Sequence, residues 1–190
     1  MTKTACRKYK NLLRTGRVLA IDPSSGSIDR KSGTRSEAGW AVFEAGQLAA
    51  SGIIQIEGSN VKQRLESLVE TLTNDFEEAF DVLVIEDIWG YIASKTLVHA
   101  AGLFIAHIKT PYYVEMNVKT WQGIATRLGV WTKSDENDAI FIGIGAMVTS
   151  TGYIHKSIKR DADRVAKLGQ IAAEWNYWGI EEMQQHFEGE

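Results

Sequence analysis

The chain has 190 residues, 44% of them hydrophobic and 24% charged, with a formal net charge of −3, and this average composition excludes disordered, collagen-like and low-complexity proteins. No apolar stretch approaches the roughly 18–20 residues of a membrane span, and the N-terminus lacks the apolar core of a secretory signal. Because Cys6 is the only cysteine, a disulfide framework and a thiolate metal cage are excluded as well, and we expect a cytoplasmic protein with no membrane partner.

The first part of the chain predicts three strands. A buried strand over 17–22 ends in a Pro-Ser-Ser-Gly turn. The polar segment 27–37 that follows is expected to be a loop. Two further strands, over 38–44 and 47–57, are joined by Ala45-Gly46, which predicts a tight hairpin.

The pattern becomes helical after Ser59, which we expect to be an N-cap. Apolar residues then recur at steps of three or four and form one stripe of a helix: Val61, Leu65, Leu68, Leu72, Phe76 and Phe80. Strands and helices alternate beyond it, with strands over 81–86 and 111–116 and helices over 94–108, 118–128, 135–147 and 156–178. Three sequential strands followed by strand–helix units predict a mixed sheet covered by helices.

Four carboxylates are expected at the carboxyl ends of the parallel strands, where sheets of this kind bind their ligands. Asp22 ends the first strand and Glu86 the fourth, while Asp135 and Asp138 share one face at the start of a helix. Oxygen ligands grouped in this way suit Mg²⁺ or Mn²⁺, and two such ions can hydrolyse a phosphodiester. Each residue alone also fits a structural role as turn initiator, strand end or helix cap.

Five short motifs, in order, resemble the RuvC family of Holliday-junction resolvases in the RNase H-like superfamily: Ala20-Ile-Asp-Pro-Ser24, Gly39-Trp-Ala-Val42, Val84-Ile-Glu86, Val118-Lys119 and Asp135-Glu-Asn-Asp-Ala139. The resemblance implies an α/β fold, with a five-stranded mixed sheet of strand order 3-2-1-4-5 flanked by helices. The resemblance covers roughly residues 16–148 and implies a nuclease domain (17–150). We expect a basic N-terminal arm (1–16) before it and, after it, a C-terminal helical extension (151–190) that packs on the same domain and has no counterpart in the family. The modest length and the departures from the family pattern favour a bacteriophage member, located in the host-cell cytoplasm.

The resemblance also implies roles for individual residues. Asp22, Glu86, Asp135 and Asp138 would bind two Mg²⁺ ions per active site, with Mn²⁺ as a substitute, and Lys119 would contact the scissile phosphate. Trp89 would stack on a base at the junction, with core or interface packing as the alternative. The basic side chains expected to contact DNA are Arg30, Lys31, Arg35 and Lys133. A rival acidic pair, Asp161 and Asp163, is not directly followed by an apolar helix.

The implied activity is paired, symmetric hydrolysis of a four-way DNA junction by a homodimer, whose two-fold symmetry would match that of the substrate. One alternative is an RNase H-like nuclease that acts on other branched DNA or on RNA–DNA hybrids. Another is a non-catalytic junction-binding protein whose carboxylates are caps and turns. An actin-like ATPase is disfavoured by the short length and by the absence of a later Gly-rich phosphate loop in the sequence.

Overall fold

The computed structural model describes residues 11–28, 35–88, 94–128 and 134–150. Five strands form one mixed sheet in the order β3-β2-β1-β4-β5, which confirms the predicted fold class and strand order. The strands are β1 (Arg17–Asp22), β2 (Ala38–Glu44), β3 (Gln47–Ile54), β4 (Val82–Glu86) and β5 (Tyr113–Met116). β1 pairs antiparallel with β2 and parallel with β4. The sheet is therefore antiparallel on one side of β1 and parallel on the other.

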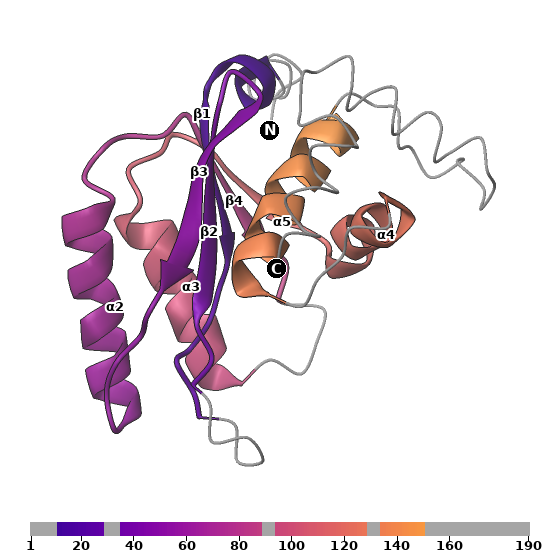
Figure 1. The fold of residues 1–190 in the computed structure, drawn as a ribbon. Coiled ribbons are helices and arrows are strands. Elements are labelled where there is room, and N and C mark those ends of the chain that lie inside the picture. Colours follow the sequence, from indigo (N-terminus) through magenta and orange to yellow (C-terminus); the bar gives the residue numbers. More distant parts are fainter. Residues whose placement is uncertain (1–10, 29–34, 89–93, 129–133, 151–190) are drawn as a thin grey trace.

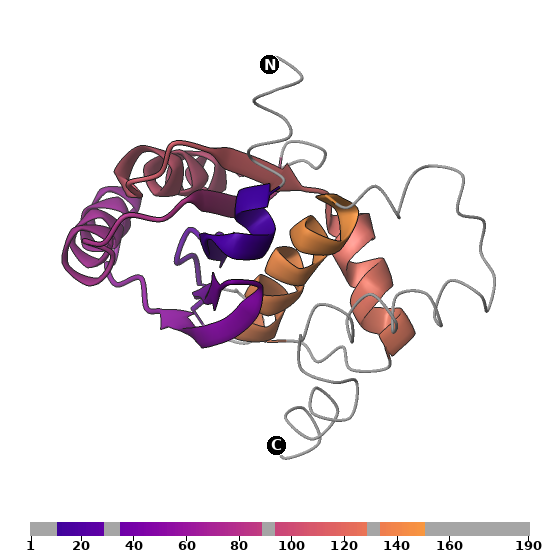
Figure 2. The ribbon, with the colours of Figure 1, turned by 90° about the horizontal axis from the view of Figure 1, so that it is seen from above.

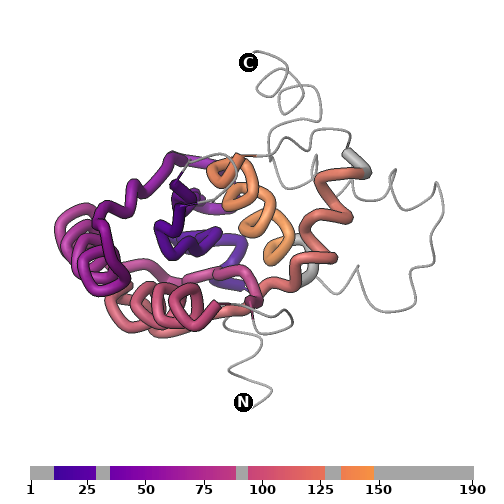
Figure 3. Tube along the Cα trace, turned by 90° about the horizontal axis from the view of Figure 1, so that it is seen from below, coloured from indigo at the N-terminus to yellow at the C-terminus, as the bar shows by residue number. Residues whose placement is uncertain are grey.

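Helices cover both faces of the sheet, as Figure 1 shows. α2 (Val61–Asp75) and α3 (Lys95–His107) lie side by side on one face, while α5 (Asp135–Ser150) lies directly on the other. α4 (Val118–Leu128) packs outside α5, farther from the sheet (Figures 2 and 3). Within the described residues, no helix has both the length and the apolar character needed to cross a membrane.

Alternate residues of the central strands build two separate cores. On β1, Val18 and Ala20 pack in the α5 core, whereas Leu19 and Ile21 pack in the α2–α3 core. Residues 11–15, at the end of the predicted basic arm, are helical and bury Leu13 in the α5 core. The predicted extension 151–190, including its helix over 156–178, lies outside the described residues.

The predicted hairpin between β2 and β3 is confirmed. Ala45 and Gly46 have φ values of 51° and 81°, as a two-residue turn of type I′ requires. β3 ends at Ile54, three residues before the end that the apolar pattern predicts, because residues 55–58 leave the ladder to reach α2.

The predicted N-cap of α2 is wrong by one residue, and the cap role considered as an alternative for Asp135 belongs to the preceding serine. The N-cap of α2 is Asn60, whose side chain accepts a hydrogen bond from the Gln63 N–H at 3.0 Å; Ser59 instead contacts the side chain of Gln63. At α5, Ser134 Oγ accepts from the Asn137 N–H at 3.1 Å. Asp135 is therefore the first residue of the helix rather than its cap, and its carboxylate is left for other contacts.

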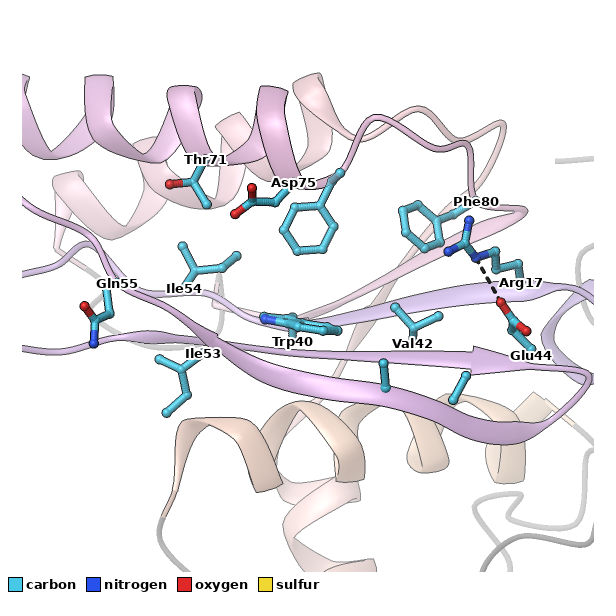
Figure 4. Close-up of a pocket in the computed structure, with 13 residues that line it drawn as sticks. Arg17, Trp40, Val42, Glu44, Ile53, Ile54, Gln55, Thr71, Asp75 and Phe80 are labelled. Carbon is cyan, nitrogen blue, oxygen red and sulfur yellow. Dashed lines mark ion pairs between the residues drawn. The ribbon is translucent and has the colours of Figure 1, made fainter.

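A cavity of about 680 Å³ lies between α2 and the β2–β3 hairpin (Figure 4). Trp40 lies across β3 at Gly52, where an added Cβ would come within 2.9 Å of the indole ring, and it meets Phe76 edge-on at 5.8 Å. Arg17 closes the far end of the cavity in an ion pair with Glu44 at 3.3 Å. The cavity is on the α2–α3 side of the sheet, opposite the face that carries the four carboxylates.

Candidate active site

Asp22 and Glu86 are neighbours at the carboxyl end of the sheet. The parallel register of β1 and β4 pairs Ile21 with Ile85, so the next residue of each strand is a carboxylate. By strand alternation both carboxylates lie on the α5 face, in the same rows as Ala20 and Val84. The two side chains share a hydrogen bond. The adjacency expected for these two carboxylates is therefore present.

Gly39 allows the start of α5 to approach this pair. It lies opposite Asp22 in the β1–β2 ladder, and a Cβ added to it would lie only 1.7 Å from the backbone oxygen of Asp135. No other residue type fits without displacing the helix. The missing side chain therefore brings the first turn of α5 against the sheet beside Asp22.

The first turn of α5 carries three carboxylates, of which Glu136 contacts β3 while Asp135 and Asp138 lie near Asp22. Glu136 accepts a hydrogen bond from Ser51 Oγ of β3 at 2.5 Å, so it is held at the edge of the sheet. The Asp135 carboxylate accepts from the backbone N–H of Glu37, and both Asp135 and Asp138 act electrostatically on Asp22. The structure thus gathers Asp22, Glu86, Asp135 and Asp138 at one place and leaves Glu136 outside.

The surroundings of these carboxylates favour their neutral forms. Burial raises the pKa of Asp22 well above its ordinary value, and the negative charges of Glu86, Asp138 and Asp135 raise it further. Burial also raises the pKa of Glu86, against hydrogen bonds from Trp121 and Asp22 that lower it. For Asp135, burial raises the pKa and the Glu37 N–H opposes it. Within the described part of the chain, the groups that shift the pKa values of these three carboxylates include no lysine or arginine.

Trp121 is a site residue that the sequence reasoning missed. Its indole Nε1 donates a hydrogen bond to Glu86 Oε1 at 3.2 Å, and the side chain is only 1% exposed. A buried indole N–H requires an acceptor, which was the signal available in the amphipathic pattern of 118–128. The identity of that acceptor depends on β4, which is remote in sequence.

Lys119 lies on the first turn of α4, outside the carboxylate cluster. Its backbone N–H donates to Asn117 Oδ1 at 3.1 Å, and its side chain is exposed. Lys119 is not among the groups that shift the pKa values of the carboxylates. Its predicted contact with the scissile phosphate therefore stays a prediction.

Arg35 has a structural role in addition to its predicted contact with DNA. Its Nη1 donates to the carbonyl oxygens of Gly58, Gly26 and Ile56, at 2.8, 3.2 and 3.4 Å. These bonds tie the end of the 27–37 segment to the β1 turn and to the chain after β3. The other candidate residues lie outside the described part of the chain: Trp89, Arg30, Lys31, Lys133, Asp161 and Asp163.

The donor set of the cluster fits a divalent cation, although in the described residues no three acidic, histidine or cysteine side chains are arranged as a ready metal cage. Burial and neighbouring negative charge disfavour the ionised form of Asp22, and a bound proton or a divalent cation would offset that charge. Oxygen-only donors are the ligands of Mg²⁺ and Mn²⁺. Binding would require Asp22 and Glu86 to release the proton that they share, so metal affinity is expected to rise with pH.

Comparison with known proteins gives similarity only at the level of structure. No protein-family model and no curated protein matches the chain. The solved structure of T. thermophilus RuvC in complex with Holliday junction substrate is similar over 91% of this chain and 94% of that chain, with 11% identity and a TM-score of 0.41. A Thermus thermophilus RuvC structure covers 91% and 95%, with 10% identity and a TM-score of 0.38.

Proposed function

We propose that this protein is a metal-dependent crossover junction endodeoxyribonuclease, which resolves four-way DNA junctions by paired, symmetric phosphodiester hydrolysis. The observation that supports a nuclease is the convergence of four carboxylates at the carboxyl edge of an RNase H-like sheet, with Asp22 under the influence of the other three. The junction as substrate comes from the motifs around these carboxylates. The bacteriophage origin and the host-cell location stay predictions from the sequence.

In this proposal Asp22 is the central ligand, Glu86 binds beside it, and Asp135 and Asp138 complete the set from α5. The two Mg²⁺ ions would supply the Lewis acid and lower the pKa of the attacking water. The chain contributes a rigid sheet edge that aligns Asp22 with Glu86, and a helix start whose approach depends on Gly39. Lys119 would steady the scissile phosphate from the first turn of α4.

Paired cleavage calls for two active sites, and the α2–α3 face offers a surface for a second copy of the chain. An apolar groove of about 810 Å³ lies between α2 and α3, and its walls include Leu65, Val69, Val98 and Leu103. Contact through this groove would leave the α5 face of each copy open to DNA. Leu103→Glu should convert a dimer into a monomer that makes unpaired nicks, as measured by light scattering and by product analysis.

The test of the proposed function is cleavage of an immobile synthetic four-way junction with Mg²⁺, with Mn²⁺ and with EDTA. The wild-type chain should introduce paired, symmetric nicks that require metal, and Asp22→Asn should introduce none. Glu136→Gln is the matched control, because Glu136 belongs to the same acidic turn but is bonded to Ser51. It should cut like the wild type.

Two other outcomes would replace the proposal. Metal-dependent cleavage of hybrids, flaps or forks, with junctions left intact, would retain the carboxylate site and change its substrate. Binding to junctions without nicks under either metal would favour a non-catalytic junction-binding protein. In that case Asp22→Asn should bind as tightly as the wild type.

A further inference from the structure

Trp121 connects the two helices of the α5 face to a carboxylate of the sheet. The indole Nε1 lies 3.2 Å from Glu86 Oε1. Trp121 also packs closely against α5, because a Cβ added at Gly145 would come within 3.2 Å of the Trp121 Cβ and 3.6 Å of its Cα. The side chain is only 1% exposed, and close packing leaves a large buried ring little room to turn, so its N–H stays directed at Glu86.

Glu86, by contrast, could take several orientations. It is the last residue of β4, and its side chain is only partly buried, so a rotation about its side-chain bonds could turn the carboxylate away from Asp22. Hydrogen bonds to both Asp22 and Trp121 favour the orientation seen here. The two donors act on the carboxylate from different elements, β1 and α4.

We propose that Trp121 is a positioning residue, whose indole N–H holds the Glu86 carboxylate in the orientation that binds metal together with Asp22. The inference rests on the proposed function, since it takes Glu86 to be a metal ligand. Outer-shell donors to metal-binding carboxylates typically change metal affinity about 10–100-fold. A tryptophan with only a packing role would instead affect stability and leave metal affinity unchanged.

The test compares Trp121→Phe with Trp40→Phe in the full-length chain. Both variants exchange a tryptophan for a smaller aromatic side chain, but Trp40 lies on the opposite face of the sheet. Mn²⁺ affinity is measured by titration calorimetry, and the unfolding midpoint is measured without metal. Trp121→Phe should bind Mn²⁺ about 10-fold more weakly or worse, whereas Trp40→Phe should bind it as the wild type does.

A second readout separates positioning from general damage. Excess Mn²⁺ should restore junction cleavage by Trp121→Phe, because the ligands themselves are intact. If Trp121→Phe does not fold, Gly145→Ala provides a second test, because its added Cβ would press on the Trp121 Cβ and Cα and shift that residue away from α5. Unchanged Mn²⁺ affinity in a folded variant overturns the positioning role.

The two proposals fail in distinguishable ways. A wild-type chain that binds Mn²⁺ but cuts no junction overturns the proposed function, while the affinities of the two tryptophan variants still decide the role of Trp121. A wild-type chain that binds no Mn²⁺ overturns both proposals.

Discussion

The two faces of the sheet are made from alternate residues of the same strands, yet they are organised differently. On the α2–α3 face, Leu19 and Ile21 continue an apolar core to the end of β1. On the α5 face, Val18 and Ala20 pack in the same way, but the next residue in that row is Asp22. The adjacent residues Ile21 and Asp22 therefore have different roles: Ile21 packs in an apolar core, whereas Asp22 is a carboxylate with a raised pKa.

Trp40 on the α2–α3 face and Trp121 on the α5 face show the same contrast between apolar packing and a specific polar contact. Trp40 rests on the sheet over Gly52 and contacts Phe76, so apolar area accounts for its position. Trp121 is buried as well, but its N–H bonds to Glu86. The α2–α3 face therefore depends on the amount of apolar surface that it buries, whereas the α5 face depends on where α4 and α5 place individual polar groups.

The largest effect on cleavage is expected from Asp22→Asn, and a substitution of the adjacent residue of β1 serves as its control. Asp22→Asn should abolish metal-dependent cleavage and raise the unfolding midpoint without metal, because it removes a charge that burial and three carboxylates disfavour. Each kcal/mol gained in the free energy of unfolding should raise the unfolding midpoint by about 2–4 °C. Ile21→Val should retain cleavage and lose about 0.5–1.5 kcal/mol of stability. Loss of cleavage in Ile21→Val alone would contradict this separation of the two faces.

Gly39→Ala should be the next most damaging change. Its Cβ would collide with the Asp135 backbone at 1.7 Å, so the start of α5 must move away from Asp22. We expect a loss of about 1–3 kcal/mol together with most of the metal affinity, measured by chemical denaturation and calorimetry. Gly123→Ala in α4 is the control, since nothing lies within 4 Å of its added Cβ. It should stabilise the helix by up to about 1 kcal/mol.

The stability of the metal-free chain should fall as pH rises above the ordinary carboxyl range. Asp22, Glu86 and Asp135 have raised pKa values, so the folded state binds more protons than the unfolded state, and the free energy of unfolding decreases with pH until these groups have ionised in the folded chain. Unfolding midpoints from pH 4 to 8 would check the slope. Addition of Mg²⁺ and the substitution Asp22→Asn should each make the stability depend less on pH. A stability that increases with pH in this range would contradict the raised pKa values.

A last pair of substitutions should separate Arg35, which bonds to backbone carbonyls, from Lys119, which is exposed and should give the smallest effect on stability. Arg35→Gln should cost about 1–3 kcal/mol of stability, because three backbone carbonyls lose their donor. Lys119→Gln, at an exposed position, should change stability by less than about 0.5 kcal/mol and lower the salt dependence of junction binding by about one charge. A similar fall in salt dependence with Arg35→Gln would show that Arg35 contacts DNA as well.

The strands and helices could be predicted from the sequence because each carries its own periodicity. The bounds of β1, β2 and α4 match the predicted ranges. Cap positions were the weak point, since Ser59 and Asn60 are both good caps, and their hydrogen bonds decide between them.

Within the candidate site, the sequence alone is enough to show which carboxylates end a strand or begin a helix. The folded chain was needed to show that Asp22 and Glu86 are adjacent, that Glu136 bonds to Ser51, and that Trp121 bonds to Glu86. The physical reason is that periodicity reflects contacts within a few residues along the chain. The site depends on the register of β1 with β4 and on the approach of α5 at Gly39, where residues far apart in sequence pack against each other.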